Sequence, residues 1–355
     1  MTYARYVALG DSQSEGLLDP DGHGGYRGWA DRFALHVAGG NPHLMYANLA
    51  VRGKLLGQMR REQLAPAQAL RPDLVTVMGG LNDLLRPGAD VAGMLAELDE
   101  LLGGFPGATV LTNTLPDPAA VSPLLRRVAP KVIAYNAGIR ATAERRGALV
   151  VDFAAHRSST DPRIWSPDRI HANPVGHALI AAGFADRLGR PGFADWSDPL
   201  PDPLALGRSA RAAAELRWVG TTLVPWAIRR ARGRSSGDGI TAKRPRLVPV
   251  APLFHLVDPA EWGSGRYTPD TGDGFVHYSF GDQVAGTADR HYAGGADLVA
   301  VEVDPMRLPG EIRIENGFPH GYGPLPPEAA VAVHPLHRDG GQWVFSAAGC
   351  ASTGR

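Results

Sequence analysis

Short apolar runs alternate with longer amphipathic stretches over the first half of the chain. The runs with the length of buried strands are Tyr6–Leu9, Leu44–Leu49, Asp73–Met78, Thr109–Asn113 and Ala148–Asp152. The stretches with apolar residues at helical spacing are 26–37, 55–70, 91–102, 131–146 and 174–188, with a kink predicted at Pro66. Strands that alternate with helices in this way form a parallel sheet with helices on both faces, so the pattern predicts an α/β fold.

The pattern changes near residue 247. Beyond it, alternating and apolar runs of β type dominate up to about residue 346, which predicts a small α+β domain. The segment before the change, 234–245, is rich in small, polar and turn-forming residues, as a linker would be. We therefore expect a first domain over 1–190, a helical and basic tail with a linker over 191–247, and a second domain over 248–355.

The charges support this division and narrow the classes of partner. The 355 residues have a formal net charge of zero, so the chain has no global field that attracts nucleic acid or a membrane. Residues 248–355 nevertheless have a net charge of −7 and the rest a net charge of +7. Opposite charges raise the hypothesis that the two parts dock within one chain, with the basic 229–246 segment against the acidic domain.

The sequence also bears on compartment and on metal sites. Its single cysteine, Cys350, excludes an internal disulfide and a thiolate metal cluster. The N-terminus has no signal-peptide pattern, and no window is apolar enough for a membrane span. We expect a cytoplasmic protein without a cofactor or a metal.

Residues able to do chemistry follow several of the predicted strands. Ser12 lies on a strand-to-helix turn after the first strand, Gly53 follows the second strand and Asn82 the third. Asp168 and His171 share a loop before the last helix. Because sites in parallel sheets form at the carboxyl ends of the strands, the fold can bring these residues together. From its own segment, Ser12 is equally well a helix N-cap or a nucleophile.

These segments, taken in order, resemble the four sequence blocks of the SGNH (GDSL-type) hydrolases. The blocks are Gly10-Asp11-Ser12, Gly53 after Asn48-Leu-Ala-Val-Arg, Gly80-Leu-Asn82-Asp83 and Asp168-Arg-Ile-His171. The resemblance covers about 1–190 by motif and extends to about 246 through a tail similar to that of actinobacterial members. Gln13 stands where the motif of the family has leucine, next to the nucleophile position. The resemblance implies a flavodoxin-like three-layer α/β/α domain with a five-stranded parallel sheet and hydrolysis of a small-molecule ester or acyl group.

The residue types fit acyl transfer through an acyl-enzyme. Ser12 needs an adjacent base to act as a nucleophile, and a histidine such as His171 can take and return its proton. Asp168 can accept a hydrogen bond from the other ring nitrogen and fix the tautomer. The oxyanion of the tetrahedral intermediate would bind to the N–H groups of Ser12 and Gly53 and to the side-chain amide of Asn82.

Other polar residues near these blocks are better explained by structural roles. We expect Asp11 to order the Ser12 turn, Asp83 to support Asn82, His177 to pack on the last helix and Asp152 to make structural hydrogen bonds. The stretch 216–228 carries Trp218 and Trp226 among arginines. It is either an interfacial or anion-binding helix or, as we favour, a helix packed on the hydrolase domain.

The second domain resembles a small bacterial family of uncharacterised function that has Gly-Phe-x-His-x-Ser and Phe-Pro-His-x-Tyr-Gly motifs. That family is similar, more distantly, to the ADP-ribosyltransferase fold, which implies handling of NAD. The candidate residues are His255, His277, Tyr278, Glu315 and His320. The plainer alternative is an accessory or dimerisation module without a ligand.

Three hypotheses about function follow. The favoured one is a serine esterase, lipase or deacetylase that acts through Ser12. The second makes the hydrolase part a scaffold, which the intact set of motif residues argues against. The third makes the C-terminal domain the principal enzyme or binding module, acting on NAD or a nucleotide-type ligand.

Overall fold

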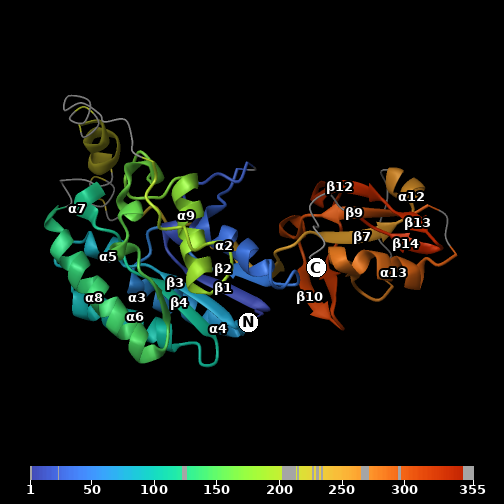
Figure 1. Ribbon diagram of the computed structural model, residues 1–355, viewed down its shortest axis with the longest axis horizontal. Coiled ribbons are helices and arrows are strands. Elements are labelled where there is room, and N and C mark those ends of the chain that lie inside the picture. Colours follow the sequence, from blue (N-terminus) through green and yellow to red (C-terminus); the bar gives the residue numbers. More distant parts are fainter. Residues whose placement is uncertain are drawn as a thin grey trace. The chain divides into compact units, whose positions relative to one another are not determined.

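The computed structural model describes residues 2–22, 24–121, 126–201, 213, 216–225, 228, 232, 235–264, 272–294 and 297–346 (Figure 1). Within the chain two compact units form. Unit 1 comprises Met1–Gly40 and Ala47–Pro245, and unit 2 comprises Asn41–Tyr46 and Arg246–Arg355. No local pattern in the chain indicates that the short segment 41–46 groups with the C-terminal unit.

A six-stranded sheet has the strand order β5-β4-β3-β1-β2-β6. The strands are β1 (Arg5–Gly10), β2 (Met45–Asn48), β3 (Leu74–Met78), β4 (Thr109–Asn113), β5 (Leu149–Val151) and β6 (Arg244–Pro249). β1 pairs in parallel with β3, β3 with β4, and β4 with β5. These strands are almost wholly buried, which is why they appear in the sequence as continuous apolar runs.

The sixth strand corrects the expected count of five. Its sequence is Arg244-Pro-Arg-Leu-Val-Pro249, which carries two prolines and begins in the predicted linker. Proline cannot donate to a ladder of backbone hydrogen bonds and is confined to edge strands or strand ends. β6 stands at the edge of the sheet, beside β2, where proline is tolerated.

Helices connect the strands of unit 1 as the periodicity predicted (Figure 1). They are α1 (Ser12–Glu15), α2 (Gly28–Ala38), α3 (Leu56–Met59), α4 (Ala65–Ala69), α5 (Leu81–Leu84), α6 (Val91–Gly103), α7 (Pro118–Val121), α8 (Ala129–Arg146) and α9 (Pro174–Arg187). Between α3 and α4 the chain makes a π-helical turn, Arg60–Leu64, and Pro66 lies in the first turn of α4. The α/β class predicted from sequence is confirmed.

Aromatic side chains build the core between α2 and α9. Trp29 on α2 stacks on Phe184 of α9, with ring centroids 4.4 Å apart. Phe33 meets the edge of Tyr6 from β1 at 5.2 Å. These rings are fully buried, so they fix α2 and α9 against each other and against the sheet.

Unit 2 is built from antiparallel strands and short helices. Two three-stranded sheets have the orders β10-β11-β8 and β12-β9-β7, and β13 pairs with β14. The strands are β7 (Leu253–Val257), β8 (Val276–His277), β9 (Val299–Val303), β10 (Glu311–Glu315), β11 (Phe318–Tyr322), β12 (Ala330–Pro335), β13 (His337–Asp339) and β14 (Gln342–Val344). The helices are α12 (Pro259–Gly263) and α13 (Val284–His291).

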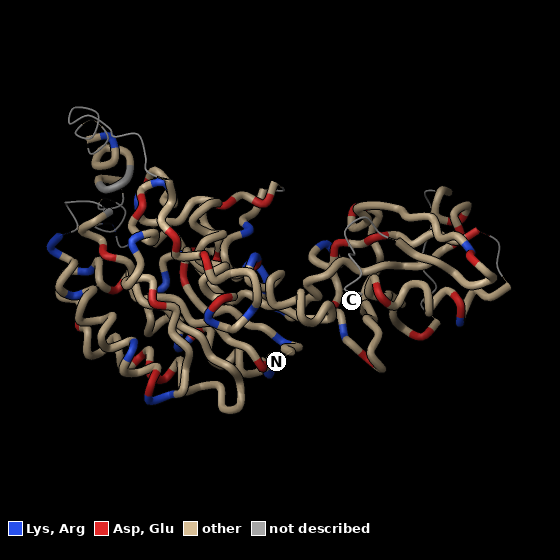
Figure 2. Tube along the Cα trace, in the orientation of Figure 1, with Lys and Arg blue, Asp and Glu red and all other residues tan. Residues whose placement is uncertain are grey.

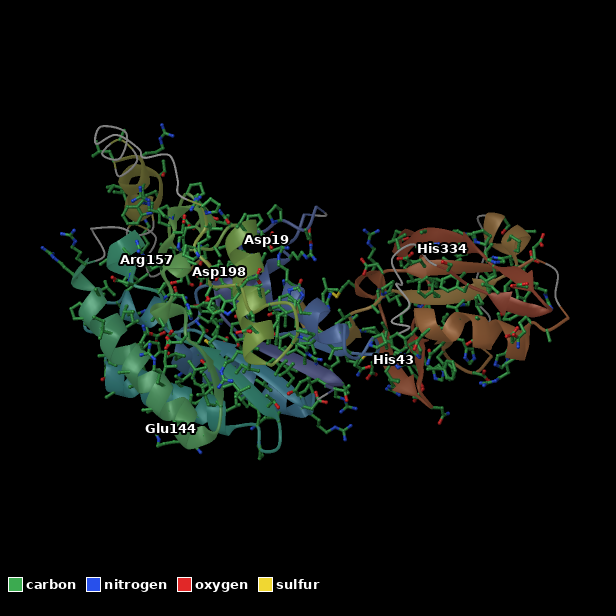
Figure 3. The ribbon with its side chains drawn as sticks, in the orientation of Figure 1. Asp19, His43, Glu144, Arg157, Asp198 and His334 are labelled. Atoms are coloured by element: carbon green, nitrogen blue, oxygen red, sulfur yellow. The ribbon has the colours of Figure 1, made fainter. Side chains whose placement is uncertain are left out.

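Charged residues of both signs are spread over unit 1 (Figure 2). In unit 2 some are paired across strands, as where His334 on β12, labelled in Figure 3, lies 2.7 Å from the Glu302 carboxylate on β9. The described part of the chain contains no helix that is both long enough and apolar enough to cross a bilayer. The 216–228 stretch and the basic 229–246 segment are described only in part. Trp226, Arg229 and Arg230 lie outside the described residues, as does Cys350.

Candidate active site

The turn that carries Ser12 is held by its own residue Asp11 and by side chains from two other elements. Asp11 caps α1 by accepting a hydrogen bond from the Gln13 N–H at 3.1 Å. Gln63 bonds to both the N–H and the carbonyl of Gly10, each at 2.9 Å. The Asn48 amide, from the end of β2, donates to the Ser14 carbonyl at 2.7 Å. The backbone on both sides of Ser12 is therefore fixed before any substrate arrives.

The structure brings Ser12, His171 and Asp168 together. His171 Nε2 lies 2.8 Å from Ser12 Oγ, and His171 Nδ1 lies 2.6 Å from Asp168 Oδ2. With a proton on Nδ1 donated to the carboxylate, Nε2 is left to accept the serine hydroxyl proton. The other Asp168 oxygen accepts the backbone N–H groups of Ile170 and His171, both at 3.0 Å.

These contacts keep the Asp168 carboxylate ionised. Burial alone would raise the pKa of this carboxyl group. The hydrogen bonds and charge of His171, with the Ile170 N–H, outweigh that effect and lower the pKa below its usual range. A permanently charged Asp168 can orient the imidazole and stabilise the imidazolium form.

Gln13 contacts the same loop on both sides of His171. Its Nε2 donates to the Ile170 carbonyl at 2.8 Å, and its Oε1 accepts the Ala172 N–H at 3.3 Å. The sequence had marked this residue only as a departure from the family motif. The local pattern contains no signal for this contact, because the two segments are 157 residues or more apart.

Gly53 lies at a close approach between two loops. It has a φ of +76°, and a Cβ placed on it would lie 2.4 Å from Ser235 Oγ. On the neighbouring residue, Arg52, the backbone N–H and the guanidinium bond to the buried Glu15 carboxylate of α1. A Cβ on Gly237 would lie 2.0 Å from the Arg52 carbonyl oxygen. The loop of Gly53 is thus fixed from one side by α1 and from the other by the 235–237 segment.

Asn82 is in place but its amide is already engaged. Its Nδ2 donates to Asp11 Oδ2 at 3.0 Å and to the Lys54 carbonyl at 3.1 Å. Burial raises the pKa of the Asp11 carboxyl to about 6, against the hydrogen bond from Gln13. An oxyanion would compete with these two acceptors for the Asn82 donor. Asp11 therefore both caps α1, as expected, and holds Asn82.

Trp218 contacts the loop that carries Asp168 and His171. The sequence predicted only that Trp218 lies on a packing helix, without a link to this loop. It is 2% exposed, and its Nε1 donates to the Asp168 carbonyl at 2.5 Å. The Arg169 guanidinium lies 5.6 Å from the centroid of its ring. The packing role favoured for this stretch agrees with the burial of Trp218. A tryptophan in a basic segment was the available sequence signal.

A cavity of about 1230 Å³, partly open to solvent, lies beside the Ser12–His171 pair. Its lining includes Asp11 and Gln13, which flank Ser12 in the chain, and Ile170 and Ala172, which flank His171. The rest of its described wall is mainly apolar, with Leu81, Leu85, Leu115, Trp165, Ile180 and Trp218 among its members.

The other polar residues weighed from sequence make structural contacts. Asp83 accepts the Leu56 N–H at the start of α3 rather than bonding to Asn82, and burial raises its pKa to about 6. Asp152 bonds to Thr114 and to the Arg140 guanidinium. Both patterns belong to structural carboxylates. In the described ranges no three histidine, cysteine or acidic side chains gather as metal ligands.

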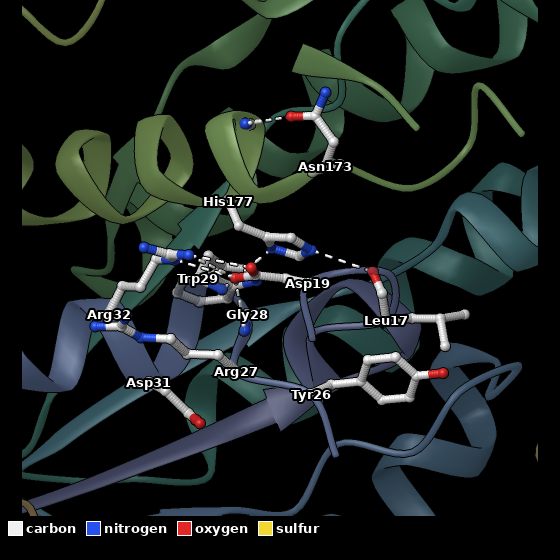
Figure 4. Close-up of polar contacts among 12 residues, drawn as sticks. Leu17, Asp19, Tyr26, Arg27, Gly28, Trp29, Asp31, Arg32, Asn173 and His177 are labelled. Carbon is white, nitrogen blue, oxygen red and sulfur yellow. Dashed lines mark hydrogen bonds and ion pairs between the residues drawn. The ribbon is translucent and has the colours of Figure 1, made fainter. Parts of the chain in front are cut away.

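His177 links α9 to the loop that precedes α2 (Figure 4). Its Nδ1 accepts the Trp29 N–H at 3.1 Å, and its Nε2 lies 3.3 Å from the Leu17 carbonyl. Burial lowers its pKa to about 4. In the same region Asp19 accepts the Gly28 N–H and the Arg32 guanidinium. This network orders the connection between α1 and α2.

The five candidates of unit 2 line one cavity of about 1520 Å³, again partly open to solvent: His255, His277, Tyr278, Glu315 and His320. Glu315 is bonded there by His320 and by the Tyr322 hydroxyl, both at 2.8 Å, and these hydrogen bonds lower its pKa. Phe275 stacks on His320 with centroids 4.1 Å apart.

Comparison with known families matches both parts of the chain. Residues 8–179 match the GDSL-like lipase/acylhydrolase family. The N-terminal unit is thus similar to this family over most of its length. Residues 256–333 match a family described as a protein of unknown function, DUF952. Both resemblances expected from the motifs are confirmed, and the GDSL-like unit makes the protein an ester-hydrolysing enzyme.

Solved structures similar to the GDSL-like unit are hydrolases. An α/β hydrolase, LAE5, from the metagenome of Lake Arreo shares 23% identity, with a TM-score of 0.45 over 52% of this chain and 95% of that chain. A catalytic mutant of Axe2, an acetylxylan esterase from Geobacillus stearothermophilus, shares 18%, with a TM-score of 0.45 over 53% and 95%. The esterase EstA from Pseudoalteromonas sp. shares 20%, with a TM-score of 0.42 over 52% and 96%. No curated protein matches the chain.

Proposed function

We propose that the GDSL-like unit hydrolyses a small-molecule ester through an acyl-enzyme on Ser12. The single observation that supports this most is the continuous chain of contacts from Ser12 Oγ to His171 Nε2 at 2.8 Å and from His171 Nδ1 to Asp168 at 2.6 Å. His171 takes the serine proton during attack and returns it to the leaving alcohol. Water then attacks the acyl-enzyme with the same base.

The negative oxygen of the tetrahedral intermediate binds to nearby N–H donors. In this proposal they are the backbone N–H groups of Ser12 and Gly53 and the Asn82 amide, which gives up one of its present acceptors. Each such donor contributes roughly a hundredfold to a thousandfold in rate. The fixed loop around Gly53 supports its part in this assignment, because an oxyanion site needs donors that do not reorganise during the reaction.

A fluorophosphonate probe tests the proposal, since it reacts with activated serines. We expect labelling of Ser12, and loss of both labelling and ester turnover in Ser12→Ala and His171→Ala. Ser14→Ala is a matched control: Ser14 lies on the same turn, is buried, and its Oγ has no hydrogen-bond partner in the described structure. Turnover that survives in Ser12→Ala would refute the assignment.

A second candidate function is ligand binding by the C-terminal unit. It is favoured by the convergence of the five sequence candidates on one cavity. If the ligand is NAD or another nucleotide, calorimetric titration of the full chain with NAD should give saturable binding. Replacing Glu315 by glutamine should weaken that binding, whereas the ester turnover should not change. Absence of heat at millimolar NAD would refute this candidate.

A further inference from the structure

The wall of the cavity beside Ser12 differs from what a sugar substrate requires. Polar recognition of a carbohydrate needs several placed donors and acceptors along the site. Among the described lining residues, the polar side chains of Asp11, Gln13 and Arg169 lie close along the chain to Ser12 or His171, and those of Asn113 and Ser159 lie farther away. Farther along the wall lie three leucines. They are Leu81 at the start of α5, Leu85 directly after the end of α5, and Leu115 in the segment after β4.

We propose that this cavity binds the acyl chain of the substrate, so that the enzyme prefers esters of medium-length fatty acids to acetate esters. This inference rests on the proposed function of Ser12. The lining includes the residues on either side of Ser12 and of His171 in the chain, although not Ser12 and His171 themselves, so the cavity lies next to the Ser12–His171 contact. The part of its wall beyond these residues is mainly apolar, so it suits the methylene groups of an acyl chain better than the single methyl of an acetyl group.

The expected effect follows from the burial of methylene groups. Each buried methylene contributes about 0.8 kcal/mol, or about a fourfold rise in kcat/KM until the cavity is filled. We therefore expect p-nitrophenyl octanoate to exceed p-nitrophenyl acetate by at least tenfold in kcat/KM. A second series, acetate esters of alcohols of increasing length, should rise much less, because the inference assigns the cavity to the acyl side.

Variants of the wall test the location of the chain. Leu85→Asn and Leu115→Asn keep the branched shape of the side chain but place an amide in the wall, so both should lower the octanoate-to-acetate ratio. Ile133→Asn, at a residue of α8 that is 69% exposed, is the matched control and should leave that ratio unchanged. Thermal melting checks that each variant is folded, and the wild-type series stands even if a variant is not.

The outcomes separate this inference from the function it rests on. If Ser12 is labelled and acetate is nonetheless the best acyl group, or if only the alcohol series rises, the acyl-chain inference is wrong and the hydrolase proposal survives. If no ester is hydrolysed and Ser12 is not labelled, the proposed function itself has failed. A rise with acyl length that is abolished in both wall variants supports the inference.

A different observation points to Gln13 as a positioning residue for His171. The geometry assigns it this role because its amide bonds to the Ile170 carbonyl and to the Ala172 N–H, the two backbone groups that flank the imidazole. Ser12 lies next to Gln13 on α1, so one side chain fixes the base relative to the nucleophile. Leucine, which the family motif has here, could make neither bond.

Kinetics of three variants test this role. Gln13→Met and Gln13→Leu keep an apolar stem without the amide, and kcat on a short ester should fall by roughly tenfold to a hundredfold, as small misplacements of a base do. KM should change less than kcat. Protonated Gln13→Glu keeps a donor and an acceptor, whereas the ionised form loses the donor to Ile170. The turnover of the Gln13→Glu enzyme, relative to that of wild type, should therefore fall as pH rises through the titration of the introduced carboxyl group.

A role limited to folding would lower the melting temperature without this pH dependence. A Gln13→Met enzyme with the kcat of the wild type, or a Gln13→Glu ratio that is constant with pH, would overturn the assignment. Both measurements use the full chain.

Discussion

His177 should make the folded protein less stable in mild acid. The imidazole is fully buried, and its Nδ1 accepts the Trp29 N–H, so this nitrogen cannot carry a proton in the folded state. Nε2 therefore carries the proton and donates to the Leu17 carbonyl. Burial lowers the pKa from 6.5 to about 4 in the folded protein, whereas the unfolded chain keeps the ordinary value.

The sign and size follow from proton linkage. Below pH 6.5 the unfolded state binds a proton that the folded state does not, so the free energy of unfolding falls as pH falls. The free energy of unfolding falls by roughly 1 kcal/mol by pH 5.5 and by roughly 3 kcal/mol below pH 4, since each unit of pKa difference is worth about 1.4 kcal/mol. Above pH 6.5 both states are neutral and His177 gives no pH dependence.

The assay compares wild type with His177→Gln, whose side chain does not titrate. Asp11 and Asp83 have raised pKa values, so they add stability as pH falls through about 6 and oppose His177. Both proteins share these carboxyls, and the difference between the two urea-unfolding profiles isolates the histidine. We expect wild type to lose stability relative to the variant between pH 6.5 and 4. Parallel profiles, or an NMR signal of His177 that titrates near pH 6.5, would refute the reasoning.

Three further predictions concern the site and its boundaries. Asp168→Asn should lower kcat by roughly 10³–10⁴ with little change in KM, because the amide no longer fixes the required tautomer of His171; steady-state kinetics measure this, and a fall below tenfold would contradict it. A chelator should leave ester turnover unchanged, and loss of turnover that zinc restores would refute a metal-independent mechanism. A fragment that ends at residue 190 should be insoluble, whereas one that ends at Pro249 should fold and turn over p-nitrophenyl esters, since it keeps Lys243, Gly237 and β6; an active 1–190 fragment would disprove this.

The parts predicted well from sequence are those whose evidence is local. Ser12, Gly53 and Asn82 each follow an apolar run, and the carboxyl ends of parallel strands meet at one edge of the sheet. Asp168 and His171 are three residues apart, so their contact needed little more than a turn. Strand and helix positions followed because burial on both faces leaves a continuous apolar run, which is visible without any partner.

The parts that were missed depend on contacts between distant segments. Gln13 appeared to be a neutral replacement, since nothing near it in the chain announces a bond to Ile170. The start of β6 lies in the predicted linker, and its two prolines fit a strand only because it stands at an edge of the sheet, which the sequence does not reveal. Asp83 was assigned to Asn82, its sequence neighbour, yet its carboxylate accepts the Leu56 N–H from α3.

The chain beyond residue 179 completes the site, although the family match ends there. The partly buried Lys243 ammonium bonds to the Tyr26 and Arg27 carbonyls and to the Asp31 carboxylate, which orders the loop after α1.

Gly237 packs on the Arg52 carbonyl beside Gly53, and Trp218 holds the carbonyl of Asp168 while lining the cavity. Each of these contacts reaches a different loop of the active site. Two proteins with the same four sequence blocks and different tails would therefore keep the same chemistry, but they would differ in how the loops are held and in what the cavity accepts. We therefore predict that substrate preference depends on the blocks and the tail together.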